Sequence, residues 1–93
     1  MRAVRLIIRG RVQGVGYRAW AVDAAARLGL DGWVRNRVDG MVEAVAAGDD
    51  ATVERFIEAC RTGPRLAHVT DVEVATADPG DAGSGGFQPR PTV

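Results

Sequence analysis

The stretch AVRLIIRGRVQGVGYRAWAVDAAARL, residues 3–28, decides the fold because its periodicity changes partway along. Residues 3–9 alternate between apolar and other side chains, which predicts a strand. The segment Gly10–Gly16 holds three glycines and predicts a loop. Apolar residues then recur at spacings of three and four, which predicts an amphipathic helix over 17–28. The apolar faces consist of Val4, Leu6 and Ile8 in the strand and of Tyr17, Trp20, Ala21, Ala24, Ala25 and Leu28 in the helix.

The middle of the chain predicts a hairpin and a second helix. Asp39-Gly40 separates the strand-like runs Trp33–Val38 and Met41–Ala46, which is typical of a hairpin with a two-residue turn. A second helix begins after Gly48-Asp49-Asp50, which offers a capping carboxylate, and ends at Gly63-Pro64. Its apolar face consists of Val53, Phe56, Ile57 and Cys60.

The C-terminal third predicts one full strand and little further regular structure. Val69–Thr76 is that strand, with Val72 and Val74 directed inward. Residues 78–86 (DPGDAGSGG) have the composition of a flexible loop. Residues 87–93 carry two prolines at alternate positions, so they form an edge strand at most and otherwise a tail.

The predicted elements follow the order β-α-β-β-α-β, which is the ferredoxin-like plan. We therefore expect an α+β sandwich in a single domain over residues 1–93. Its antiparallel sheet has four strands, or five if the tail pairs, and two helices pack on one face. This plan hosts many unrelated functions, so the function has to be argued from particular residues.

Composition excludes several classes of protein. Hydrophobic residues make up 46% and charged residues 26% of the chain, which excludes wholesale disorder. One cysteine (Cys60) and one histidine (His68) exclude a disulfide framework and a multi-cysteine or His-rich metal site. All 12 basic residues are arginine, which excludes lysine-based phosphate loops and Schiff-base chemistry. No apolar run reaches membrane-spanning length, so we expect a cytoplasmic protein.

A net charge of zero conceals a strong asymmetry. Residues 1–37 hold eight arginines against two aspartates, a balance of +6, and residues 38–93 hold four arginines against ten acids, a balance of −6. Such a cationic half attracts an anionic ligand if its arginines converge in space. If they are scattered and solvated, the asymmetry has no function.

The loop GRVQGVGYR, Gly10 to Arg18, is the strongest candidate for that ligand. Its glycines let successive N–H groups point into one concavity, and the loop leads to the N-terminus of a helix, where anions are favoured. Arg11 and Arg18 bracket this segment, and an arginine fork matches phosphate geometry. The alternative is a tight strand-to-helix turn with exposed arginines.

Asn36 is the second unusual residue. Parity places it on the same strand face as Val34 and Val38, so a polar amide lies on the apolar side of the sheet and needs a partner or a role. Alternatively, Asn36 belongs to the relaxed end of the strand and only assists the turn at Asp39-Gly40.

Three segments, GRVQGVGYR (10–18), LGLDGWVRN (28–36) and DGMVEAVAAG (39–48), together resemble the acylphosphatases. The resemblance implies the ferredoxin-like fold and the hydrolysis of acyl phosphates to a carboxylate and inorganic phosphate. It implies no cofactor, no metal and no nucleic-acid or membrane partner, and we expect a monomer acting on a small molecule. It also implies that the loop binds the phosphoryl group, that Arg18 is the catalytic clamp, and that Asn36 orients the attacking water. The implied phosphate-binding residues are Gly10, Arg11, Val12, Gln13, Gly14 and Val15.

This chain departs from the common family pattern at a few positions. Tyr17 stands where phenylalanine is frequent, and Arg37 follows Asn36 where a hydroxyl residue is often found, which concerns how the asparagine is held. Pro89 and Pro91 remove two N–H donors from the terminal strand.

Other readings of the sequence remain open. An RNA-binding module of the same element order needs aromatic residues on its central strands, and the strands over 4–9 and 41–46 have none. A catalytically idle anion sensor fits the motifs, and only turnover distinguishes it. A domain of a larger, carbamoyl-phosphate-handling maturation protein is disfavoured because these 93 residues carry no other domain. The remaining candidates are interpreted as a surface residue (His68), core residues (Cys60, Trp20, Trp33) and solvated acids (Glu43, Glu73).

Overall fold

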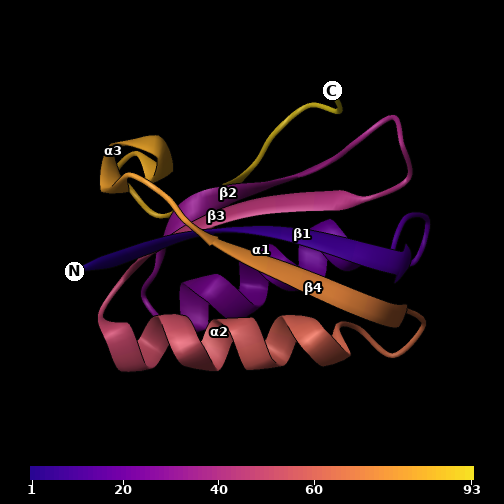
Figure 1. Cartoon of the computed structure of the whole chain (residues 1–93), viewed down its shortest axis with the longest axis horizontal. Coiled ribbons are helices and arrows are strands. Elements are labelled where there is room, and N and C mark those ends of the chain that lie inside the picture. The colour runs from indigo at the N-terminus through magenta and orange to yellow at the C-terminus, as the bar shows by residue number, and fades with distance from the viewer.

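In the computed structural model, which describes residues 1–93, five strands form one sheet and two long helices cover one of its faces (Figure 1). The strand order is β4-β1-β3-β2-β5. The predicted ferredoxin-like sandwich is confirmed. The elements are β1 (Arg2–Arg11), α1 (Tyr17–Arg27), β2 (Asp31–Asn36), β3 (Val42–Gly48), α2 (Asp50–Thr62), β4 (His68–Thr76), α3 (Pro79–Ala82) and β5 (Phe87–Pro89). No helix is long and apolar enough to cross a membrane.

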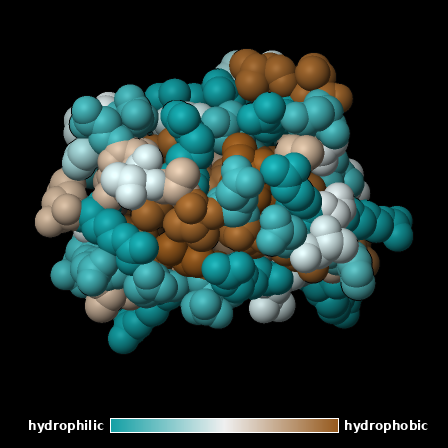
Figure 2. Space-filling view, in the orientation of Figure 1, coloured by the Kyte–Doolittle hydropathy of each residue, from teal (hydrophilic) through white to brown (hydrophobic).

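The main core lies between the sheet and the two long helices. Val4, Leu6 and Ile8 alternate along β1 and are buried, as their spacing predicts. They pack with Tyr17 of α1 and Phe56 of α2 in one hydrophobic cluster. Burying side chains of this size stabilises the fold by about 1.5–3 kcal/mol each. On the face seen in the orientation of Figure 1, a patch of hydrophobic residues is visible near the middle of the surface and is surrounded by hydrophilic residues (Figure 2).

The turn between β2 and β3 is one residue longer than predicted. Asn36 pairs with Val42, and Arg37 N–H donates to the Met41 carbonyl at 2.9 Å, so the loop consists of Val38, Asp39 and Gly40. A two-residue type I′ turn needs a positive φ at both positions, but only Gly40 has one (φ 91°). As a result, Val38 is 88% exposed and does not continue the apolar face, contrary to its predicted position.

Asp39 holds this turn with its side chain. Its carboxylate accepts the backbone N–H of Met41 at 3.0 Å and the Nε–H of Arg37 at 3.0 Å. The Met41 hydrogen bond first, and then the nearby Arg37 guanidinium, hold the pKa of Asp39 below its usual value.

The inward face of β4 is only partly buried. Val72 pairs with Ile8 and Val74 with Leu6, so both lie on the inward face as predicted, but only Val72 is buried and Val74 is 37% exposed. The reason is the strand order: β4 is an edge strand, and no further strand covers its outer side.

Residues 79–82, which were expected to lie in a flexible loop, form the one-turn helix α3. The carboxylate of Asp78 caps it by accepting Gly80 N–H at 2.9 Å, and Trp33 Nε1–H donates to the Asp81 carbonyl at 2.9 Å. Figure 1 shows α3 across the sheet from the two long helices. There it closes a second, smaller core formed by Ala3, Trp33, Val45, Ala47 and Ala82.

After α3 the chain reaches the free side of β2, and β5 runs parallel to β2, unlike the antiparallel sheet that was predicted. Arg90 N–H donates to the Val34 carbonyl at 2.9 Å. Val93 N–H donates to the Asn36 carbonyl at 3.2 Å. Pro89 and Pro91 alternate with Arg90, so the positions without an N–H face away from β2.

Candidate active site

The loop between β1 and α1 is shaped by glycines. At Gly10 (φ 119°) a Cβ atom would overlap the carbonyl oxygen of His68, so only glycine fits there. The pairing of β1 with β4 shifts register between Arg9 and Gly10 and then continues to Arg11, so the strand extends beyond the predicted boundary. Gly14 and Gly16 also have positive φ, of 72° and 81°. The backbone therefore curls as a nest of N–H groups requires.

The N-terminus of α1 is left open by its own sequence. Its N-cap is Gly16, which has no side chain to accept a backbone N–H, and no acidic residue lies in the first turn. The first N–H groups of a helix have no partner within the helix, and the helix dipole gives this end a partial positive charge. This end is therefore available to an anion.

Two arginines near this loop have no ion-pair partner. They show where the excess positive charge of residues 1–37 lies. Of the eight arginines in residues 1–37, only Arg11 and Arg18 form no ion pair with a carboxylate. The six paired arginines are Arg2, Arg5, Arg9, Arg27, Arg35 and Arg37. The uncompensated positive charge of the N-terminal half is thus concentrated at the two ends of the glycine loop.

Asn36 is the last residue of β2 and lies on the helix side of the sheet, as parity predicts. Its backbone is fixed by pairing with Val42 on one side and by the N–H of Val93 on the other. Its side-chain amide bonds to no protein group, and no buried side-chain nitrogen or oxygen lacks a partner, so this amide is accessible from solvent. It can therefore bind a water or a ligand.

These features converge on one cleft of about 500 Å³. Of the predicted site residues, Val12, Gly14, Arg18 and Asn36 line it, whereas Gly10, Arg11, Gln13 and Val15 do not. The full lining is Val12, Gly14, Gly16, Tyr17, Arg18, Ala19, Val22, Asn36 and Pro89. Sequence reasoning missed Ala19, Val22 and Pro89. The i, i+3 spacing of Ala19 and Val22 places them on one helix face beside Arg18, but nothing in the sequence brings Pro89 to that face.

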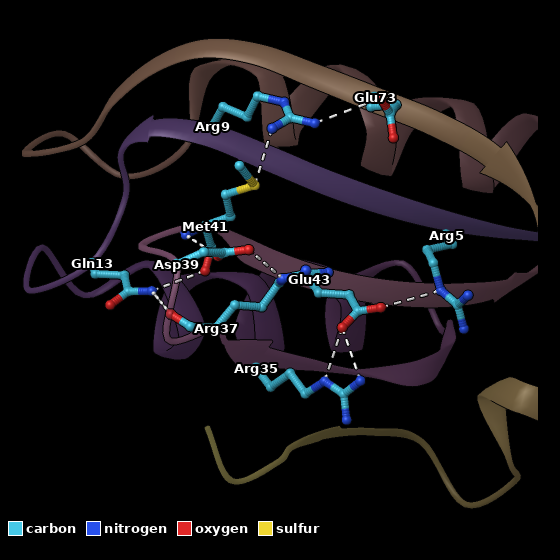
Figure 3. A network of polar contacts seen from close by, with 9 residues as sticks. All are labelled: Arg5, Arg9, Gln13, Arg35, Arg37, Asp39, Met41, Glu43 and Glu73. Atoms are coloured by element: carbon cyan, nitrogen blue, oxygen red, sulfur yellow. Dashed lines mark hydrogen bonds and ion pairs between the residues drawn. The ribbon is translucent and has the colours of Figure 1, made fainter. Parts of the chain in front are cut away.

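Gln13 connects the loop to the turn that follows Asn36. Its Nε2 group donates to the carbonyls of Arg37 at 2.7 Å and Met41 at 2.9 Å (Figure 3). The resemblance assigns the backbone amide of Gln13 to phosphate binding, and the side chain of Gln13 is directed to the turn. The side chain of Arg37 contacts Asp39 and makes no hydrogen bond to Asn36. The loop and the strand that carries Asn36 are thus joined by two hydrogen bonds from one amide.

Glu43, which was interpreted as a solvated acid, is buried with 5% exposure. Its carboxylate accepts both Nε and Nη2 of Arg35 at 2.9 Å and lies 3.3 Å from Nε of Arg5 (Figure 3). Parity correctly placed Glu43 on the face away from the long helices, but arginines of the neighbouring strands cover it. Glu73 is exposed as expected and lies 3.6 Å from Nη2 of Arg9.

No histidine, cysteine or carboxylate side chain lines the cleft. Tyr17 turns its hydroxyl into the core, where it donates to the Cys60 carbonyl at 2.7 Å, and burial raises the pKa of Tyr17 far above its usual value. Burial also raises the pKa of the Cys60 thiol to about 12. His68 is exposed at the start of β4, outside the cleft. The structure contains no cluster of three or more His, Cys, Asp or Glu residues that could hold a metal ion.

Known proteins match this chain over most of its length. A sequence model of the acylphosphatase family matches residues 4–88. An acylphosphatase of Azorhizobium caulinodans is 54% identical over 90 residues, which cover 97% of this chain and 96% of that protein. The crystal structure of acylphosphatase from Bacillus subtilis matches with a TM-score of 0.90 and 38% identity, covering 97% of this chain and 99% of that one.

The same fold also occurs within a longer protein. The crystal structure of full-length HypF matches with a TM-score of 0.82 and 26% identity, over 98% of this chain but only 12% of that chain. The relatives matched over their full length are single acylphosphatases of the same size. The match to the family model and to these relatives over nearly the whole chain shows that this protein belongs to the acylphosphatase family.

Proposed function

We propose that the loop Gly10–Val15 and Arg18 hold the phosphoryl group of an acyl phosphate while Asn36 orients the attacking water. The reaction is the family's hydrolysis of the mixed anhydride to a carboxylate and inorganic phosphate. One observation carries the proposal: the open N-terminus of α1, the unpaired Arg18 and the accessible amide of Asn36 line the same cleft.

The chemistry requires binding and orientation more than proton transfer. The carboxylate of an acyl phosphate is a good leaving group, so the enzyme has to stabilise charge on the equatorial phosphoryl oxygens and place water in line. Backbone N–H groups of the loop and the Arg18 guanidinium are fixed donors for these oxygens. Each such donor typically stabilises a transition state by about 3 kcal/mol.

Asn36 would perform the second task. The oxygen of its amide accepts a hydrogen bond from water and turns a water lone pair toward phosphorus. The water oxygen then bonds to phosphorus, and the phosphorus–oxygen bond to the acyl group breaks with its electron pair on the departing carboxylate. The proton of the water passes to a phosphoryl oxygen or to solvent, because no side chain in the cleft serves as a base.

Gln13 would act indirectly, as a positioning residue. Its two hydrogen bonds to the β2–β3 turn set the distance between the loop that binds phosphate and the strand that carries Asn36. We expect the protein to act as a monomeric domain on small molecules in the cytoplasm.

The direct test is phosphate release from benzoyl phosphate by the purified protein, with and without excess EDTA. We expect saturable release that is unchanged by EDTA, because the nest and Arg18 supply the positive charge. Binding of inorganic phosphate without any turnover would identify the anion sensor instead. Activity that EDTA abolishes and Mg²⁺ restores would contradict the metal-free mechanism.

A further inference from the structure

The carboxylates that form no ion pair all lie at one end of the molecule, which we call the acidic end. The strand β1 begins there, where Arg2 pairs with Gly48 and the N–H of Ala77 donates to the Ala3 carbonyl. The neighbouring segments, at the start of β2, at the start of α2 and in α3, carry these side chains. The carboxylates without an arginine partner are Asp31, Asp49, Asp78 and Asp81.

Arginines that form no ion pair gather at the opposite end, around the glycine loop. Arg11 and Arg18 were described above, and Arg65 lies in the turn between α2 and β4. This turn adjoins the loop, because Val69 at its end pairs with Gly10. Figure 1 shows the β1–α1 loop and the α2–β4 connection together at one end of the molecule, with α3 at the other. Arg11, Arg18 and Arg65 are called the cationic end below.

The neutral chain therefore has two ends of opposite charge, and the cleft lies at the cationic one. The molecule measures 30 Å along its longest axis. The Debye length is about 30 Å at 0.01 M salt, so the fields of both ends reach an approaching ion at low ionic strength. Such a field draws an anion toward the cleft and away from the acidic end.

Arg65 contributes to this field without belonging to the cleft. Its side chain is exposed, and Arg65 is not among the residues that line the cleft. Its influence on a bound anion therefore depends on charge alone and is weakened by salt. A residue that contacts the substrate differs in this respect, because its effect depends on geometry and persists in salt.

We infer that the cationic end concentrates the anionic substrate at the cleft by long-range attraction, and that Arg65 acts in this way from outside the cleft. The inference rests on the proposed function and adds a residue to it. The same attraction holds the phosphate product, so Arg65 lowers both the KM of the substrate and the inhibition constant of phosphate. Because it acts equally on ground state and transition state, it leaves kcat unchanged.

The test measures hydrolysis of benzoyl phosphate, and its inhibition by inorganic phosphate, in 10 mM and 0.5 M KCl. Arg65→Glu reverses the charge at the cationic end. Arg55→Glu is the matched control, because Arg55 is also exposed and forms no ion pair but lies seven residues, about 10 Å, before the end of α2. Chloride that competes in the cleft acts on all three proteins, so the ratio of variant to wild type is compared.

We expect Arg65→Glu in 10 mM KCl to raise KM and the inhibition constant of phosphate about fourfold. This is about twofold for each of the two unit charges, the size expected for charges more than 10 Å apart in water. Arg55→Glu should raise both constants less than about twofold. In 0.5 M KCl both ratios should approach one, and kcat should match the wild type throughout.

Equal effects of Arg65→Glu and Arg55→Glu, or a ratio that persists in 0.5 M KCl, would overturn the long-range role of Arg65 while leaving the hydrolytic function intact. Absence of turnover in the wild type would instead overturn the proposed function. Arg65→Gln removes one charge and should raise KM about twofold in 10 mM KCl. It decides the question if Arg65→Glu does not fold.

Discussion

Two glycine-rich segments of this chain look alike in sequence and differ in structure. Gly10–Gly16 leads into α1, and Asp78–Gly86 contains α3. In the second segment Asp78 is the N-cap of α3, and its carboxylate accepts a hydrogen bond from the N–H of Gly80. In the first segment Gly16 is the N-cap of α1, so no side chain accepts a hydrogen bond from the first N–H groups of α1. The residue at the cap, more than the glycine content, distinguishes a helix end that satisfies itself from one that can receive a ligand.

The surroundings reinforce this difference. The first segment contains Arg11 and is followed closely by Arg18, and neither arginine has an ion-pair partner. Asn36 lines the same cleft. The second packs Ala82 into a small core and accepts a hydrogen bond from Trp33. We therefore expect changes around the first segment to reduce activity with little loss of stability, and changes in the second to do the reverse.

The largest effect should come from Arg18→Ala. We expect kcat/KM to fall roughly 10³-fold and inhibition by inorganic phosphate to weaken, because the arginine stabilises the phosphoryl charge in ground state and transition state. The free energy of unfolding should change by less than about 0.5 kcal/mol, since the side chain is exposed. Arg55→Ala, at an unpaired arginine on α2, is the control. Near-native turnover of Arg18→Ala would remove Arg18 from the site.

Asn36→Ala should lower kcat roughly 100-fold and leave the inhibition constant of phosphate nearly unchanged, because the amide is proposed to contact water and not phosphate. Steady-state kinetics with phosphate as a competitive inhibitor separates the two quantities. If kcat falls and the inhibition constant of phosphate rises by a similar factor, Asn36 belongs to the phosphate-binding group.

Gln13→Leu keeps the approximate size of the side chain and removes both donors to the β2–β3 turn. The carbonyls that lose Gln13 still accept other backbone N–H groups, of Gly40 and Arg37. The free energy of unfolding should therefore fall by only about 1 kcal/mol. We expect kcat to fall about tenfold, because without these hydrogen bonds the loop and Asn36 are no longer held in a fixed position relative to each other. Gln88→Leu is the control, and unchanged kcat in Gln13→Leu would reduce Gln13 to a structural role.

Asp78→Ala tests the second segment. It removes the cap of α3, so the free energy of unfolding in urea should fall by about 0.5–1 kcal/mol, near the lower end for caps because Asp78 is exposed. We expect kcat/KM to match the wild type. Asp81→Ala is the control for stability, because the Asp81 carboxylate makes no hydrogen bond or ion pair. A loss of activity in Asp78→Ala would show that the two segments are coupled.

The smallest effect should be that of pH. Burial raises the pKa of Tyr17 and Cys60, so both stay neutral, and the lowered pKa of Asp39 keeps it charged. We therefore expect kcat to be nearly constant between about pH 5.5 and 7.5, above the carboxylate range and with arginine fully charged. His68→Gln should leave this profile unchanged. A bell-shaped profile that loses one limb in His68→Gln would show that the histidine takes part.

Features that arise from local periodicity could be predicted from the sequence. The alternation in β1 and the helical spacing from Tyr17 produced the right elements on the right faces, and parity placed Asn36 toward the cleft. The length of the β2–β3 turn could not be predicted, because it depends on whether Asp39 adopts a positive φ. The helix α3 depends on contacts between Trp33 and residues nearly fifty positions away.

The sequence predicted the motifs of the candidate site one by one. That the glycine loop and Asn36 lie at the same cleft follows from the strand order, which the sequence pattern does not show. The burial of Glu43 was missed because parity assigns a face and says nothing of what covers it, and the cover comes from Arg5 and Arg35 on neighbouring strands. The side-chain contacts of Gln13 lie 24 and 28 positions along the chain, beyond any local pattern. Pro89 reaches the cleft only because β5 pairs with β2.

The prolines of the C-terminal segment bear on how this protein meets other copies of itself. A sheet edge with free N–H and C=O groups is a template on which another strand can add, and this is a common route to aggregation. Pro89, the last residue of β5, and Pro91 occupy outward positions, where they offer no donor to an approaching strand. Arg90 between them donates its N–H inward to the Val34 carbonyl. At the opposite edge, β4 carries the exposed carboxylates of Asp71 and Glu73 and an irregularity in its pairing near Gly10. The two prolines make the C-terminal segment a poor strand, and for the same reason they protect this edge of the sheet from association with another strand.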